Sequence, residues 1–323
     1  MKIQKRNFTR KEFIKTSSLG AIATGILAGS PLRAIADPGK NAGAGQIAGH
    51  EGTTGSGELA KSMLGKTGIE MTRLGVGAPR IQEPNVLKYA LDSGVTFIDT
   101  GRIYANGKNE IMVGEVVKGR RKDLVIQSKL KINEKAIEGK LNSEATSAKI
   151  RDIFNKSLDE SLAALQTDYI DVMLFHDGST NELLYHETVL ESFTKAKKEG
   201  KIRAFGYSVH YNLIERIKQH NENPFYDVVM YSFNPHGRYK NSQRDYTWDQ
   251  ETLMVELEKA ANSGTGIVAM KTCLGGPWCC EGDEEKTYPG SVKWVLQKPY
   301  IHTSAVAMAS FQQLDEHLAV HKN

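Results

Sequence analysis

The chain has 323 residues, of which 40% are hydrophobic and 25% are charged, an ordinary composition for a globular protein of one large or two small domains. The formal net charge is +4, but the first 36 residues hold seven Lys or Arg and one acidic residue. The remainder holds 35 basic and 37 acidic residues. A nearly neutral body without a basic stripe excludes nucleic acid as an expected partner.

Residues 1–36 have the pattern of an export signal. A positively charged start precedes a mildly apolar stretch at 19–28, and the small-x-small triplet Ala34-Ile35-Ala36 supplies a cleavage site. The segment "TRKEFIK", residues 9–15, resembles a twin-arginine signal in which Lys11 replaces the second arginine. A general secretory signal and an uncleaved N-terminal anchor are the alternatives. The stretch is too short and too rich in Gly, Ser and Thr for a membrane-spanning helix, so we expect no stable membrane insertion after cleavage.

The twin-arginine route carries folded proteins. It would suit an enzyme that must acquire a cytoplasmic cofactor before export, and it predicts a periplasmic or otherwise exported protein that folds first. Residues 37–62, dense in Gly, Ala, Ser and Thr, are predicted to be a flexible linker. The folded domain is predicted over 63–323, beginning with a β-hairpin around Lys66-Thr67-Gly68.

Short, β-branched runs then alternate with stretches that have helical periodicity. Eight strands are predicted, at 74–77, 96–99, 124–129, 170–176, 204–208, 228–232, 267–271 and 304–307. Gly200 and Gly264 stand where helix C-termini favour a left-handed residue. Near-continuous apolar strands, each followed by a helix, predict a parallel sheet buried on both faces. The fold class is therefore α/β, a (β/α)8 TIM barrel whose amino-terminal end is capped by the hairpin.

Catalytic groups of such barrels stand at the carboxyl ends of the strands. Four ionisable residues occupy that position on successive strands: Asp99, Tyr104, Lys129 and His176. Each alone has a structural explanation, as a helix cap, a packed ring, a solvated lysine or a core histidine. Together they form a general acid: Asp99 would hold Lys129, the ammonium would favour the phenolate of Tyr104, and His176 would orient a carbonyl and help to pass the proton.

The motifs "FIDTGRIYANGKNE", "LVIQSKL", "IDVMLFH", "GKIRAFGYSVH" and "DVVMYSFN" resemble those of the aldo-keto reductases in order and spacing, from Met63 onward. Asp99, Tyr104, Lys129 and His176 match the catalytic tetrad of that family. The resemblance implies a barrel that binds NADP(H), or alternatively NAD(H), in extended form across its mouth, with no Rossmann fingerprint and no metal.

The resemblance also implies cofactor contacts. Gly77 would lie beside the nicotinamide ribose, Ser208 would bind the carboxamide, and Lys271 would approach the pyrophosphate. Gln313 stands where relatives often have the arginine that binds the 2′-phosphate. Further differences from the family pattern are Val209 for an asparagine, Met230 for a glutamine and His317 for the adenine-side asparagine.

The sequence thus predicts an oxidoreductase that transfers hydride between a nicotinamide cofactor and an aldehyde, ketone, sugar or the corresponding alcohol, with Tyr104 as general acid or base. The alternative is a non-catalytic nucleotide-binding or regulatory barrel that keeps the fold. Trp278, in the loop after the seventh strand, is a candidate pocket wall. Cys273, Cys279 and Cys280 are expected to be ordinary thiols, because their spacing suits neither a disulfide framework nor a metal. The sequence leaves the oligomeric state open.

Overall fold

The protein divides into two units, residues 1–53 and 54–323. A computed structural model describes residues 57–133, 137, 143–179, 182–240 and 245–322, all in the second unit. The predicted signal 1–36 lies outside the described residues, as does most of the predicted linker. Within the described part, no helix combines the length and the apolar character needed to cross a bilayer.

Eight parallel strands close into a barrel, in which the last strand pairs with the first. They are β3 (Leu74–Gly77), β4 (Phe97–Asp99), β5 (Val125–Leu130), β6 (Ile170–Phe175), β7 (Ile202–Val209), β8 (Val228–Ser232), β11 (Gly266–Met270) and β12 (Thr303–Val306). All eight predicted strands are confirmed, with ends that differ from the predicted ones by at most two residues. Their residues are almost entirely buried because helices cover the outer face of the sheet.

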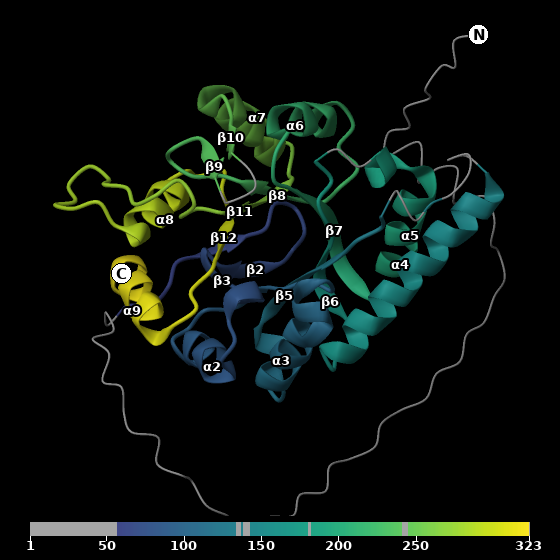
Figure 1. Ribbon diagram of the computed structural model, residues 1–323, viewed down its shortest axis with the longest axis horizontal. Coiled ribbons are helices and arrows are strands. Elements are labelled where there is room, and N and C mark those ends of the chain that lie inside the picture. Colours follow the sequence, from purple (N-terminus) through teal and green to yellow (C-terminus); the bar gives the residue numbers. More distant parts are fainter. Residues whose placement is uncertain (1–56, 134–136, 138–142, 180–181, 241–244, 323) are drawn as a thin grey trace, which may run out of the picture. The chain divides into compact units, whose positions relative to one another are not determined.

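A helix follows each barrel strand, and Figure 1 shows the helices arranged around the strands. They are α2 (Pro84–Asp92), α3 (Lys108–Val117), α4 (Glu144–Ala164), α5 (Glu187–Lys198), α6 (Leu213–Glu222), α7 (Gln250–Asn262), α8 (Tyr288–Leu296) and α9 (Phe311–His321). Short 3-10 turns are η1 (Ala78–Arg80), η2 (Tyr104–Gly107), η3 (Arg121–Asp123) and η5 (Glu182–Tyr185). Gly200 and Gly264, which follow α5 and α7, have φ of +76° and +102°, as the sequence predicted.

The predicted N-terminal hairpin is present as β1 (Lys61–Met63) and β2 (Glu70–Thr72), an antiparallel pair. It begins two residues before Met63. Leu64, Ile69 and Met71 are buried against barrel residues such as Phe97 and Val228. These contacts close the amino-terminal end of the barrel with apolar side chains.

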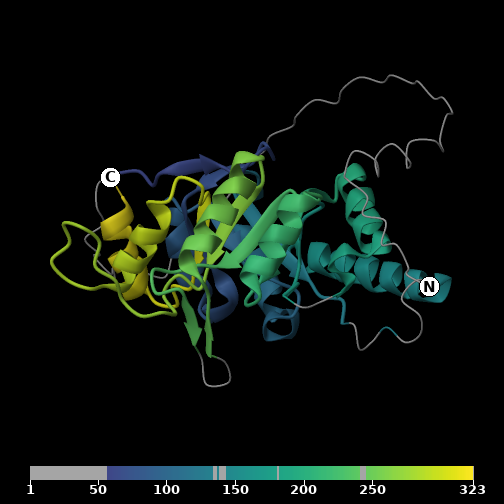
Figure 2. The same ribbon diagram turned by 90° about the horizontal axis from the view of Figure 1, so that it is seen from above.

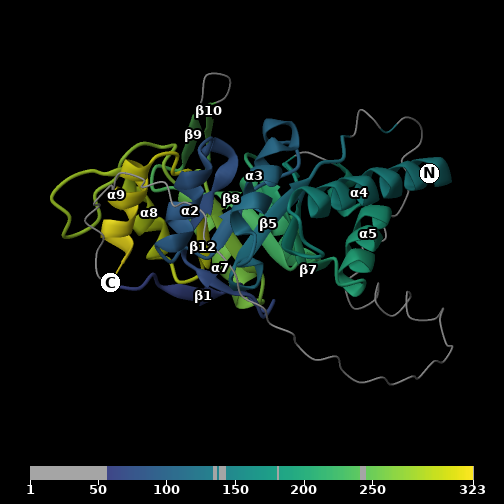
Figure 3. The same ribbon diagram turned by 90° about the horizontal axis from the view of Figure 1, so that it is seen from below.

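A second antiparallel hairpin, β9 (Arg238–Lys240) and β10 (Asp245–Thr247), follows β8 and was not predicted. Tyr239 and Tyr246 are partners in its register, and Arg238 donates to Asp245 through its Nε at 2.8 Å. Figures 2 and 3 show this hairpin projecting from the barrel. Its strands are short and polar, so they lack the apolar run that identified the others.

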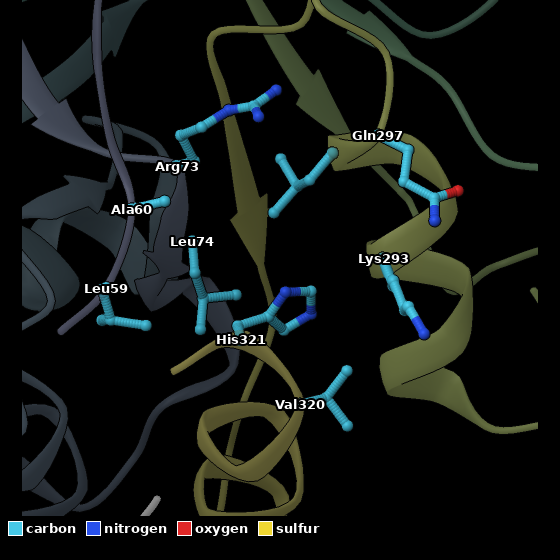
Figure 4. A pocket seen from close by; sticks show the side chains of 9 residues that line it. Leu59, Ala60, Arg73, Leu74, Lys293, Gln297, Val320 and His321 are labelled. Atoms are coloured by element: carbon cyan, nitrogen blue, oxygen red, sulfur yellow. The ribbon is translucent and has the colours of Figure 1, made fainter. Parts of the chain in front are cut away.

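A cavity of about 220 Å³ lies at the amino-terminal end of the barrel. Its lining includes Arg73 and Leu74, where β3 begins, and Gln297 after α8, and Figure 4 shows His321, at the end of α9, beside Leu74. The helices run back from the carboxyl ends of the strands, so their own last residues meet the strand starts. This cavity therefore lies away from the barrel end that carries Asp99 and Lys129.

The turn after β4 has an unusual backbone. Ala105 and Asn106 have φ of 48° and 53°, and Gly107 has φ of 86°, so three consecutive residues are left-handed. A residue other than glycine is disfavoured in the left-handed backbone conformation because its Cβ approaches the following carbonyl oxygen. At Gly107 an added Cβ would also lie 1.5 Å from Nη2 of Arg102, so the guanidinium of Arg102 would have to move.

We expect Ala105→Gly to stabilise the protein by about 1 kcal/mol, because glycine adopts the left-handed conformation without steric penalty. Ala148→Gly is the matched control, since Ala148 lies exposed inside α4 and the same change there should destabilise by about 1 kcal/mol. Urea unfolding of the two variants and the parent measures both effects. Destabilisation by both variants would contradict strain at Ala105.

The imidazoles of His317 and His321 stack on the inner side of α9, with centroids 6.1 Å apart. Burial lowers the pKa of His317 to about 3, and the charge of His321 adds to that shift. Burial likewise lowers the pKa of His321 to about 4. Both rings are therefore neutral in the folded protein at neutral pH.

The pKa of each histidine is lower in the folded protein than in the unfolded chain, where it is near 6.5. The protein is therefore more stable above pH 6.5, and this stability is lost as the pH falls toward the folded-state pKa. For His317, which is 5% exposed, the loss between pH 6.5 and 5 is about 2 kcal/mol. His317→Asn should flatten the pH dependence of the free energy of unfolding over that interval. Urea titrations at pH 8, 6.5 and 5 measure this, and equal slopes for parent and variant would contradict it.

Candidate active site

The four predicted catalytic residues come together at the carboxyl end of the barrel. Asp99 is the last residue of β4, Lys129 is the penultimate residue of β5, and His176 directly follows β6. Tyr104 begins η2 in the loop after β4. Because β4, β5 and β6 are neighbours in the sheet, strand register alone places their ends side by side.

A buried ion pair forms the centre of the site. Lys129 Nζ lies 2.5 Å from Asp99 Oδ1 and donates to the Thr100 carbonyl at 2.7 Å. The two side chains are 1% and 5% exposed. Burial on its own lowers the pKa of Lys129, but Asp99 and Tyr104 raise it more, and the net shift is upward. Lys129 is therefore an ammonium at all physiological pH values.

The phenol ring of Tyr104 lies beside that ammonium. Lys129 Nζ is 4.9 Å from the ring centroid, and the His176 ring meets the phenol edge-on at 5.5 Å between centroids. Burial raises the pKa of Tyr104, and Asp99 adds to this, while the charge and hydrogen bond of Lys129 lower it. The net shift is upward. The prediction of a more acidic phenol is wrong in this structure, because desolvation outweighs the ammonium.

His176 is a neutral imidazole. Burial lowers its pKa well below the ordinary value, and the nearby Lys129 and His210 lower it further. Its Nδ1 is buried, and no hydrogen-bond partner reaches it from the described residues. A neutral ring can donate from one nitrogen, which fits the predicted orienting role. The neutral ring also has one acceptor nitrogen, so its part in passing the proton stays a prediction.

A second buried network, of hydrogen bonds and an ion pair, connects the turn that carries Tyr104 to β5. Arg102 Nη1 lies 2.8 Å from Glu110 Oε2, and Ser128 Oγ donates to Glu110 Oε1 at 2.5 Å. Ser128 precedes Lys129, so this network joins the turn to β5 on the strand face opposite the ammonium. Reasoning from the sequence missed Glu110 and Ser128.

The predicted cofactor residues lie around the same barrel end, since Gly77 ends β3, Ser208 is near the end of β7, Lys271 follows β11 and Gln313 is in the first turn of α9. The Ser208 hydroxyl accepts from the Asp177 amide at 3.2 Å and retains its own proton to donate. Lys271 has φ of +58° and places its ammonium 4.5 Å from the centroid of the Tyr239 ring. These two groups fit an amide oxygen and a phosphate respectively.

Gln313 makes a local contact. It is exposed, and its Oε1 accepts from the Ala309 amide at 2.8 Å. The side chain offers a neutral amide at the position where a 2′-phosphate would be expected. A phosphate dianion binds best to guanidinium or several cations, so this position fits the phosphate poorly.

The loop after β11 packs against α8 and the barrel rim. Trp278 pairs with Thr287 in an isolated bridge, and its ring lies 5.2 Å from His236 and 6.5 Å from Trp294. These contacts make Trp278 part of the rim packing. All three cysteines are free thiols. Among the residues described, no cluster of three or more His, Cys, Asp or Glu side chains is arranged to hold a metal ion.

Gln127 is a further site residue that the sequence reasoning missed. It is fully buried on β5, and its Nε2 donates to Asp99 Oδ1 at 2.6 Å. The available signal was a glutamine directly after the apolar run Leu124-Val125-Ile126 in a strand predicted to be buried, since such a residue is rarely buried without a specific partner.

Curated relatives match parts of the chain. The oxidoreductase YqkF of Bacillus subtilis, described as uncharacterised, is 30% identical over 171 residues, which cover 50% of this chain and 54% of that protein. The L-galactose dehydrogenase of Arabidopsis thaliana is 31% identical over 156 residues, which cover 44% and 46% of the two chains. The chain thus spans about half the length of these relatives.

Solved structures share the fold. The holo form of the aldo-keto reductase AKR11C1 from Bacillus halodurans has a TM-score of 0.64 at 21% identity, over 81% of this chain and 91% of that one. An aldo-keto reductase from Klebsiella pneumoniae in complex with NADPH has a TM-score of 0.59 at 21% identity, over 81% and 89%.

The profile of the Aldo/keto reductase family matches residues 77–297, which include the tetrad and six complete barrel strands, β4 to β8 and β11. The chain therefore belongs to the aldo/keto reductase family.

Proposed function

We propose that this protein reduces a carbonyl compound, an aldehyde, ketone or sugar, with Tyr104 as the general acid, or oxidises the corresponding alcohol. The observation that carries the proposal is the convergence of Asp99, Tyr104, Lys129 and His176 on one end of the barrel. A reduced nicotinamide nucleotide, when bound, supplies hydride to the carbonyl carbon. As hydride is added, the carbonyl oxygen becomes negatively charged, and the residues of this chain orient and protonate it.

Tyr104 gives its phenolic proton to that oxygen. The raised pKa of Tyr104 keeps the phenol protonated through neutral pH, so the general acid is in its proton-donating form at that pH. Lys129 stabilises the phenolate that remains, and Asp99 holds the ammonium in place. The neutral His176 donates an N–H to the carbonyl oxygen and fixes its direction.

The pH dependence of reduction follows from these shifts. Activity requires a protonated phenol and a neutral imidazole, so it should be flat near neutrality. It should fall only at alkaline pH, as the phenol ionises, and at low pH, as His176 gains a proton.

Ser208 would bind the nicotinamide carboxamide, Lys271 the pyrophosphate, and Gly77 would pass close to the ribose. We propose NADP(H) as the cofactor, supported by the relative from Klebsiella pneumoniae that is in complex with NADPH. NAD(H) is the alternative, and the neutral Gln313 favours its acceptance. A panel of aldehydes, ketones and sugars assayed separately with NADPH and NADH, by nucleotide absorbance, defines both substrate and cofactor.

Tyr104→Phe should reduce carbonyl reduction by about 100-fold or more, because the general acid is lost. Binding of NADPH, measured by its fluorescence, should be unchanged. Tyr169→Phe is the matched control, since Tyr169 directly precedes β6 at the amino-terminal end of the barrel and should leave turnover unaffected. A parent protein that binds nucleotide and reduces none of the carbonyls would favour the non-catalytic barrel instead.

We also propose that residues 1–36 direct export of the folded protein to the periplasm and that the predicted linker 37–62, apart from its last two residues, which begin β1, joins the signal to the barrel. The proposal rests on the charge, apolar stretch and Ala34-Ile35-Ala36 triplet of the sequence. A nucleotide acquired in the cytoplasm would then cross with the protein. Nucleotide found in protein purified from the periplasm supports this step, and protein without nucleotide contradicts it.

Expression of the full chain in a Gram-negative host should yield periplasmic protein that begins at Asp37, as read by mass spectrometry. Changing Arg10 and Lys11 together to glutamine should keep the uncleaved chain in the cytoplasm, because the charged pair of the signal is lost. Fractionation of parent and variant measures the difference. Uncleaved parent protein in the cytoplasm would contradict both the signal and its cleavage site.

A further inference from the structure

The buried amide of Gln127 lies beneath the ion pair of the active site. It is on β5 two residues before Lys129, so both side chains face the barrel interior. Asp99 is its partner in the strand register with β4. The amide therefore reaches the carboxylate from below, while the ammonium reaches it from the mouth side.

Asp99 Oδ1 accepts from both groups. Lys129 Nζ lies at 2.5 Å and Gln127 Nε2 at 2.6 Å from the same oxygen. A carboxylate oxygen with two short donors has little rotational freedom, and its charge is shared between them. The position of Lys129, and through it the field at the Tyr104 phenol, depends on that oxygen.

The contacts of Gln127 fix the orientation of its amide. Nε2 also lies 3.3 Å from the Sδ atom of Met230, on β8 across the barrel. A flipped amide would turn its oxygen toward the Asp99 carboxylate, which is repulsive. The amide oxygen Oε1 is consequently buried, and no donor among the described residues reaches it.

A buried acceptor without a donor is unfavourable, and a methionine of similar volume would avoid it. Apart from the weak sulfur contact, the glutamine supplies one interaction that a methionine cannot, which is the hydrogen bond to Asp99. We propose that Gln127 is a positioning residue that holds Asp99 and draws off part of its charge, so that the Lys129 ammonium remains effective at the Tyr104 phenol. The inference rests on the proposed function, in which Tyr104 is the acid.

The expected effect of removing the amide has a definite sign. Without the Gln127 donor, the full charge of Asp99 acts on Lys129 and on the phenol. Asp99 makes the phenol less acidic, as its present contribution already does. Loss of Gln127 should therefore weaken Tyr104 as a proton donor.

The test uses the full chain with 4-nitrobenzaldehyde as the probe carbonyl and NADPH as the probe nucleotide. Gln127→Met should lower kcat by about 10-fold, the scale of one hydrogen bond to a charged group. It should move the alkaline limb of the pH profile upward by about one unit and leave KM for NADPH unchanged. Ser304→Ala is the matched control, because Ser304 on β12 is also a buried polar residue whose Oγ has no partner among the described residues. It should change neither kcat nor the profile.

Gln127→Glu gives a sharper signature. When protonated, the new carboxyl group can donate to Asp99 as the amide does, so activity at low pH should approach that of the parent. When ionised, it repels Asp99, so activity should fall as pH rises, through a titration that Gln127→Met lacks. Because glutamate has the shape of glutamine, this variant also decides the question if the methionine variant does not fold.

A measurement without substrate separates this inference from the proposed function. Ultraviolet difference titration of each protein against its own Tyr104→Phe version isolates the Tyr104 phenol. The phenol should titrate at higher pH in Gln127→Met than in the parent. If the parent reduces no carbonyl, the function fails while this titration still decides the role of Gln127. A folded Gln127→Met protein with an unchanged phenol titration would overturn the inference, as would unchanged kcat and pH profile.

Discussion

The site depends on one interaction, the buried ion pair of Lys129 with Asp99. Two charges removed from water lose several kcal/mol of hydration each, and their attraction offsets this only when further hydrogen bonds complete the arrangement. Here the Thr100 carbonyl and the Gln127 amide supply those bonds. The register of β4 with β5 brings all four groups together, so the closed barrel is a precondition of the pair.

The fold could be predicted because each barrel strand is a short apolar run followed by a helical period. Val228–Ser232, for example, is bounded as predicted since both of its faces are buried. The β9–β10 hairpin escaped prediction because its strands have three residues each and mix charged with aromatic side chains. Strand-end position likewise predicted that Asp99, Lys129 and His176 lie at one end of the barrel, since parallel strands bring their carboxyl ends to one side.

The electrostatics of the site could not be predicted in the same way. A sequence shows that Lys129 can stand beside Tyr104, and the ammonium does lower the pKa of the phenol. The sequence does not show how far folding removes the phenol from water. This burial sets the net direction of the pKa shift of Tyr104. Gln127 was missed for a related reason, because its partner Asp99 is 28 positions away and becomes adjacent only through strand register. Gln313 shows the same limit at the cofactor end, where its contact with the Ala309 amide emerged only from the folded loop.

The protonation states found here favour one direction of the proposed reaction. Carbonyl reduction needs a protonated phenol and an imidazole that donates without carrying charge, and both are present at neutral pH. Alcohol oxidation needs the phenolate as a base, and burial makes that form the less populated one. The Lys129 ammonium makes the phenolate less unfavourable relative to the phenol. Both reduction and oxidation pass through the phenolate, so this stabilisation serves both directions of the reaction. In the reduction, Tyr104 is a neutral phenol before the reaction and again after it regains a proton. Between these two states, the Lys129–Asp99 pair stabilises the negative charge of the phenolate.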